Sequence, residues 1–141
     1  MSKLLKNVLI SMVCCFCIFS LVSCSGGGIN KDEAKLFIRD FFDAIVAEDY
    51  EKAETFLHSE RPADLESFLL DVEEKEDLDF QAGIEIIKYT GFSSSFYDST
   101  VGGSTYQPTI RTKVGEKTVR FTIEIVQNEN GYGIYNLDIN T

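Results

Sequence analysis

The chain has 141 residues, enough for one modest domain, because single domains typically contain about 100–150 residues. It carries 23 acidic and 13 basic side chains, a formal net charge of −10. Residues 31–79 hold 17 acidic and 6 basic side chains, a net charge of −11, whereas residues 80–141 are near neutral with 6 and 5. Such an acidic surface repels phosphate groups, which excludes nucleic acid as a partner.

Residues 1–23 have the pattern of a secretory signal peptide. Lys3 and Lys6 supply a positive start, and an apolar run follows from Val8 to Phe19. This run is shorter than the roughly 20 apolar residues that a transmembrane helix needs. We therefore expect the segment to be cleaved, with a retained membrane anchor as the alternative.

The cysteines support a specific kind of signal peptide. All four, Cys14, Cys15, Cys17 and Cys24, lie within the first 24 residues, so the mature chain would keep only Cys24 and could form no internal disulfide. Residues 21–24, LVSC, resemble the bacterial lipoprotein lipobox. That resemblance implies cleavage between Ser23 and Cys24, a diacylglycerol on the Cys24 thiol, and usually an acyl chain on the new N-terminus.

The expected cellular location follows from this resemblance. Covalent lipid at Cys24, rather than basic charge, would hold the protein on a membrane of the cell envelope, with its domain outside the cytoplasm. Ser25 is compatible with the outer membrane if the source is Gram-negative. Residues 24–30 would form the lipidated cysteine and a flexible, glycine-rich tether before the domain at 31–141.

Three helices are predicted at the start of that domain. Asn30 is a suitable N-cap for a helix over 31–47, and a second helix over 50–57 has Asp49 as its N-cap. Pro62 suits the first turn of a third helix that begins at about 59–62. The residues expected to face inward are Ala34, Phe37, Ile38, Phe41 and Ile45 in the first helix and Leu65, Phe68, Leu69 and Val72 in the third.

After Asp79 the apolar period changes from helical to alternating, which indicates strands. Alternation covers 84–86, 110–114 and 119–125, and a last strand is expected over 132–139. Gly115-Glu116 fits a two-residue type II′ hairpin, and residues 128–131 form a second turn. The stretch 91–104 is expected to be a short strand with a long exposed loop. The pattern predicts an α+β fold, with three N-terminal helices packed on a curved antiparallel sheet of about four strands.

Two stretches resemble the nuclear transport factor 2-like superfamily. Residues 37–57, FIRDFFDAIVAEDYEKAETFL, are similar to its opening helices, and residues 130–137, NGYGIYNL, to its last strand. Tyr132 or Gly133 stands where that strand usually has tryptophan. The resemblance implies a cone-shaped fold around a cavity, which the isomerase and cyclase members of the superfamily use for catalysis.

No residue is assigned a catalytic role, because a cavity base must face inward and the strand acids Glu85 and Glu124 should face outward. His58, the single histidine, is expected at the surface or in a cap. Asp77-Leu78-Asp79 lacks the glycine of a calcium loop. We therefore expect no metal and no cofactor.

Aromatic and aliphatic side chains leave a choice between a pocket for an apolar ligand and a filled core. The candidates for pocket lining are Phe41, Ile45, Phe68, Tyr106, Phe121 and Tyr135. Aromatic residues on strands more often fill a core. The functional prediction is a membrane-tethered, non-enzymatic binding module for a partner protein or a small apolar ligand. The alternatives are an isomerase or cyclase type of enzyme, and an immunity or stress-response lipoprotein with an acidic partner-binding face.

Overall fold

The computed structural model describes residues 28–141. The predicted signal peptide and its cleavage site, Ser23 and Cys24, lie outside the described residues, as does most of the tether. Within residues 28–141, no helix is both long and apolar enough to cross a membrane.

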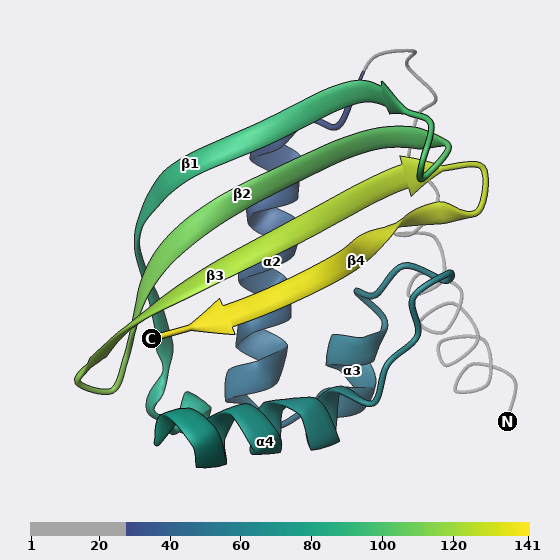
Figure 1. Ribbon diagram of the computed structural model, residues 1–141. Helices are drawn as coiled ribbons and strands as arrows, with labels where there is room; N and C mark the ends of the chain where they lie inside the picture. The colour runs from purple at the N-terminus through teal and green to yellow at the C-terminus, as the bar shows by residue number, and fades with distance from the viewer. Residues whose placement is uncertain (1–27) are drawn as a thin grey trace, which may run out of the picture.

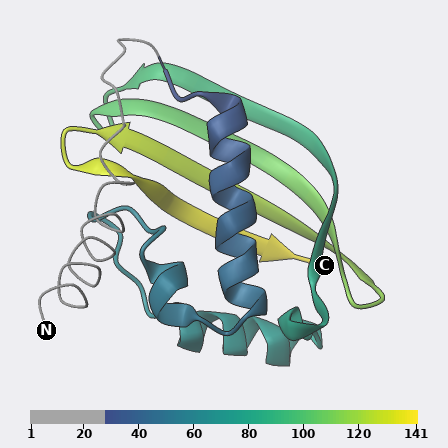
Figure 2. The same ribbon diagram turned by 180° about the vertical axis from the view of Figure 1, so that it is seen from behind.

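The described chain is an α+β fold with one antiparallel sheet in the order β1-β2-β3-β4. The elements are α2 (Lys31–Val46), α3 (Tyr50–Glu54), α4 (Leu65–Glu76), the 3-10 helix η2 (Phe80–Ala82), β1 (Ile84–Asp98), β2 (Gly103–Val114), β3 (Lys117–Asn128) and β4 (Gly131–Asn140). Figures 1 and 2 show a curved sheet with α2 running across its concave face, while α3 and α4 gather at the C-terminal end of α2. The α+β prediction is confirmed, although only α2 lies along the sheet.

Helix α2 forms where its cap and apolar spacing predict it. The Asn30 side chain accepts hydrogen bonds from the backbone N–H groups of Asp32 at 2.9 Å and Glu33 at 3.3 Å. The helix ends at Val46, and Glu48 then turns the chain with φ at +56°. Its buried face consists of Ala34, Ile38, Phe41, Phe42, Ala44 and Ile45.

The core lies between this face of α2 and the concave face of the sheet. The rings of Phe42 and Phe121 pack with their centroids 4.8 Å apart. Alternate residues of the two central strands point toward the helix and are buried, among them Tyr106, Ile110, Val114, Val119, Phe121, Ile123 and Ile125. Large side chains therefore occupy the interior between helix and sheet.

The connection between α3 and α4 differs from the prediction. Helix α3 ends at Glu54 rather than at residue 57, and the expectation that the next helix begins at 59–62 is wrong. Helix α4 begins at Leu65, because the Asp64 carboxylate caps it by accepting from the Ser67 N–H at 2.9 Å and the Ser67 hydroxyl at 2.8 Å. Pro62 lies in the connection instead.

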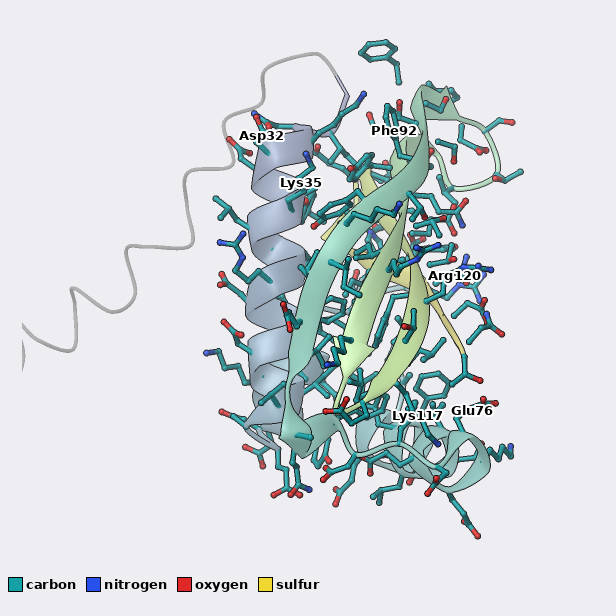
Figure 3. All side chains as sticks on the ribbon, turned by 90° about the vertical axis from the view of Figure 1, so that its left-hand side faces the viewer. Asp32, Lys35, Glu76, Phe92, Lys117 and Arg120 are labelled. Carbon is teal, nitrogen blue, oxygen red and sulfur yellow. The ribbon has the colours of Figure 1, made fainter. Side chains whose placement is uncertain are left out.

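Lys117, the first residue of β3, binds the C-terminus of α4 to the sheet. Figure 3 shows Lys117 beside Glu76. The Lys117 ammonium donates to the carbonyl oxygens of Glu76 at 3.0 Å and Asp77 at 2.6 Å, and to the Asp77 carboxylate at 2.9 Å. A cation at the last carbonyls of a helix satisfies groups without intrahelical partners and is favoured by the helix dipole.

The predicted long loop over 91–104 is also wrong. Strand β1 continues to Asp98 and pairs with β2 along its length, with register shifts between Ile86 and Lys88, Tyr89 and Gly91, and Ser95 and Asp98. Serine and glycine give no alternating pattern, but the backbone hydrogen bonds of an edge strand do not depend on side chains. The hairpin prediction at Gly115-Glu116 is confirmed: Val114 pairs with Lys117, and Gly115 has a φ of +57°.

The outer face of the sheet carries a row of three exposed cations. Lys88 lies opposite Arg111, and Arg111 lies opposite Arg120. Within residues 28–141, none of the three has a carboxylate within 4.0 Å. Like charges directly opposite one another across strands are destabilising. The row of three cations contrasts with the acidic helices.

Gly133 permits the closest approach between β4 and the segment after α3. A Cβ atom at this position would lie 2.6 Å from the backbone nitrogen of His58 and 2.8 Å from its Cα. Both atoms belong to backbone, so they cannot yield as a flexible side chain would.

We expect Gly133→Ala to destabilise the domain by about 2–3 kcal/mol, because overpacking forces backbone apart. Gly91→Ala is the matched control, since nothing lies within 4 Å of its added Cβ, and it should shift stability by at most about 0.5 kcal/mol. Urea unfolding followed by circular dichroism measures both. Equal urea midpoints for the two variants would show that the backbone of His58 can move away from position 133 at no cost.

Candidate binding site at the β4 edge

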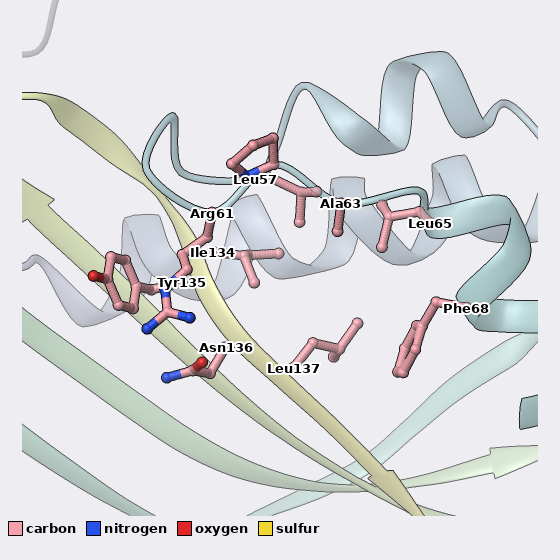
Figure 4. Close-up of a pocket in the computed structure, with 10 residues that line it drawn as sticks. Leu57, Arg61, Ala63, Leu65, Phe68, Ile134, Tyr135, Asn136 and Leu137 are labelled. Atoms are coloured by element: carbon pink, nitrogen blue, oxygen red, sulfur yellow. The ribbon is translucent and has the colours of Figure 1, made fainter.

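A half-open pocket of about 280 Å³ lies between the α3–α4 connection and β4. Figure 4 shows it between Phe68 of α4 and Leu137 of β4, with Arg61 reaching over from the connection. Its lining is Leu57, Arg61, Pro62, Ala63, Leu65, Phe68, Ile134, Tyr135, Asn136 and Leu137. The lining is mostly apolar, with one guanidinium and one side-chain amide.

The pocket exists because the connection pairs with the edge of β4 at a single point. Ile134 donates its N–H to the Phe56 carbonyl at 2.8 Å, and the His58 N–H donates to the Ile134 carbonyl at 2.8 Å. Leu57 and Ile134 thus form an isolated parallel bridge. The chain then leaves the edge, and the pocket opens beside the next residues of β4.

His58 holds the connection in place. It was predicted at the surface or in a cap, and the surface position is wrong. The residue is only 1% exposed. Its Nδ1 accepts from the Glu60 N–H at 3.2 Å, so Nε2 carries the proton and donates to Asn128 Oδ1 at 3.1 Å and the Gly131 carbonyl at 3.2 Å. These hydrogen bonds make His58 a structural residue that joins the connection to the β3–β4 turn.

The same turn is bound by a small polar network. The Asn128 amide donates to the Glu60 carboxylate at 2.7 Å and to the Val101 carbonyl at 2.8 Å, and the Asn130 amide donates to Glu60 at 3.1 Å. The hydrogen bond from Asn128 is the main cause that lowers the pKa of Glu60, followed by that from Asn130. Glu60 is therefore ionised at neutral pH and committed to the turn.

Arg61 is the cation of the pocket. Its guanidinium lies 4.5 Å from the centre of the Tyr135 ring, within the range of a cation–π interaction. Within residues 28–141, no carboxylate lies within 4.0 Å of Arg61. Its donors are thus available to a carbonyl or carboxylate oxygen placed over the pocket.

The structure separates the six residues that the sequence suggested as pocket lining. Phe68 and Tyr135 line this pocket. Phe68 was expected to face the core but is 36% exposed. The other four, Phe41, Ile45, Tyr106 and Phe121, are buried in the core between α2 and the sheet. The pocket is therefore outside the fold's interior, at the edge of the sheet.

Sequence reasoning missed Leu57, Arg61, Asn136 and Leu137. Their meeting depends on the bridge between Leu57 and Ile134, which joins positions far apart in the chain. One signal was available: Asp64, two residues after Pro62, is a strong N-cap residue, and placing the helix start there leaves Arg61 in a loop.

Acid–base groups do not converge at this pocket. Within the described chain, no group of three or more His, Cys, Asp or Glu residues could hold a metal ion. Glu85 is exposed, and the Glu124 carboxylate accepts a hydrogen bond from the Asn136 amide. Burial is the main cause that raises the pKa of Tyr132 far above its ordinary value, so this phenol stays protonated.

Comparisons with known proteins found no match for this chain among family models, curated proteins or solved structures.

We expect His58→Ala to destabilise the domain by about 2–3 kcal/mol, because it removes buried hydrogen bonds and leaves Asn128 without one of its partners. Arg61→Ala, in the same connection but exposed, should cost at most about 1 kcal/mol, the strength of an exposed cation–π contact. Thermal or urea unfolding compares the two. A His58→Ala variant as stable as Arg61→Ala would contradict the structural role of His58.

Proposed function

We propose that this chain is a lipoprotein of the bacterial cell envelope, tethered through lipid on Cys24, whose domain binds an extended segment of a partner protein along β4. The single observation that carries the binding role is the partly used edge of β4. The protein's own segment 56–58 pairs with this edge only at Ile134 and then turns away.

The remainder of the edge is suited to an added strand. In the part of the chain that the structure describes, residues 136–140 form backbone hydrogen bonds to no element other than β3. Unpaired groups on an edge strand bind extended peptides by main-chain hydrogen bonds, and neighbouring pockets take alternate side chains. The pocket beside Asn136 and Leu137 lies where such a side chain would point.

The pocket is small and open on one side, which is compatible with a side chain of a bound peptide. Pockets for drug-sized ligands usually have volumes of about 300–1,000 Å³. This pocket, at about 280 Å³ and half-open, falls just below that range. It has room for one or two apolar side chains, while Arg61 is free to bind a main-chain carbonyl or a carboxylate of the same segment.

The filled interior also supports a binding role over catalysis. The resemblance to the nuclear transport factor 2-like cone remains part of the proposal, supported by the order of helices and strands. Enzymes of that superfamily work in a cavity inside the cone, whereas here Phe41, Tyr106 and Phe121 are buried in the core. The isomerase or cyclase alternative would need a cavity that these side chains occupy.

The lipid anchor predicts the behaviour of a Cys24→Ser variant. We expect it to leave the membrane fraction and to incorporate no labelled palmitate, because serine offers no thiol for the diacylglycerol. Cell fractionation and palmitate labelling measure the two effects. Full membrane retention with unchanged labelling would refute lipidation at Cys24.

The binding site predicts position-dependent cross-linking. We expect a photoreactive benzoylphenylalanine in place of Phe68 to form protein adducts in the cells that make this protein, and Arg61→Glu in the same chain to lower their yield several-fold. The matched control places the same group at Thr118, which is exposed on β3 away from the pocket. Equal adducts at both positions would argue against a site at β4, and adducts of small mass at Phe68 alone would indicate a small ligand instead.

A further inference from the structure

Three large aromatic side chains in the last seven residues of β1 are exposed. Phe92, Phe96 and Tyr97 are 58%, 81% and 68% exposed. We call these three residues the aromatic tip. A group of exposed rings costs solvation free energy and commonly marks a surface that contacts another phase or molecule.

The tip lies where the tether joins the domain. The Phe96 ring packs against Gly28, the first described residue, so closely that an added Cβ on Gly28 would lie 3.0 Å from the ring. The Lys31 ammonium lies 3.8 Å from the centre of the Phe92 ring. Figure 3 shows Phe92 at the same end of the molecule as Asp32 and Lys35, at the start of α2.

The length of the tether limits how far the tip can be from the membrane. Cys24 and Gly28 are four residues apart, a span of at most about 14 Å for an extended chain. The headgroup region on each side of a bilayer is about 5–8 Å thick. A lipid on Cys24 would therefore keep Gly28, and the rings beside it, at or near the headgroups.

We propose that the aromatic tip inserts into the membrane interface beside the lipid anchor and orients the domain on the bilayer. This inference rests on the proposed lipidation of Cys24. Tyrosine is favoured at the headgroup level, where the ring of Tyr97 would be partly buried and its phenol hydrated. Phenylalanine side chains such as Phe92 and Phe96 bury at the boundary between headgroups and acyl chains. Because acyl chains already give stable attachment, the tip determines orientation rather than membrane affinity.

The charge distribution favours the same orientation. Around the tip, residues 28–35 and 92–104 carry two basic and three acidic side chains, a net charge of −1. Residues 64–79, which include α4, carry eight acidic and one basic side chain, a net charge of −7. Figure 2 shows α4 at the opposite end of α2. Helix α2 has 16 residues and is about 24 Å long, well beyond the Debye length of about 8 Å. With the tip on the bilayer, the acidic end is thus far from anionic headgroups.

Depth-dependent quenching tests the orientation. The full chain with Ser99→Cys, beside the tip, is labelled with an environment-sensitive fluorophore after purification from membranes, when lipid blocks the thiol of Cys24. It is reconstituted in phosphatidylethanolamine and phosphatidylglycerol vesicles that contain a lipid with a nitroxide near the headgroup end of its acyl chain. Glu74→Cys on α4 is the control position. We expect quenching at least threefold stronger at Ser99→Cys, and equal quenching would overturn the proposal.

A second variant separates the tip from the tether. In the Ser99→Cys chain, Phe92→Ser, Phe96→Ser and Tyr97→Ser together should lower the quenching to the Glu74→Cys level while palmitate incorporation stays unchanged. Unchanged quenching in the triple serine variant would mean that the tether alone orients the domain on the bilayer, which overturns the role of the rings. A fluorescence shift without nitroxide quenching would indicate self-association through the rings and would also overturn it. Loss of palmitate from the parent chain would refute the anchor itself, and with it this inference.

Discussion

The packing of α2 against the concave face of the sheet is the contact on which the rest of the fold depends. Each fully buried Phe or Ile contributes roughly 1.5–3 kcal/mol relative to exposure, and α2 buries six apolar residues on one face. The two central strands supply the matching apolar face. Because this layer is filled by large side chains, the surfaces available for binding are at the edges and ends of the sheet.

A single pairing, between Leu57 and Ile134, determines which part of the β4 edge is covered. The two hydrogen bonds at Ile134 hold the segment after α3 on the sheet, and buried His58 ties the same segment to the β3–β4 turn. Gly133 is required because the backbones meet where a side chain would stand. The chain thus covers part of its own edge strand and leaves the remainder beside an apolar pocket with a cation.

The charges divide the molecule into distinct surfaces. The acidic helices lie at one end of α2, the aromatic tip and the start of the domain lie at the other, and the row of Lys88, Arg111 and Arg120 runs across the outer face of the sheet. Opposed arginines on neighbouring strands cost stability. Within the described chain, none of the three has a carboxylate within 4.0 Å.

The sequence by itself determined those features that depend on neighbours in the chain. The Asn30 cap and the apolar spacing of α2 follow from residues within four positions of one another, and the glycine of the Gly115-Glu116 turn is a local requirement of the backbone. The lipobox resemblance at Leu21 to Cys24 is equally local, and it remains a prediction. Tertiary structure alone decided the course of β1, the burial of His58 and the position of the pocket. A serine-rich strand is held by main-chain bonds to β2, and His58 meets Asn128 across 70 positions of sequence. Neither kind of contact leaves a periodic pattern, because the partner that stabilises it lies on another element.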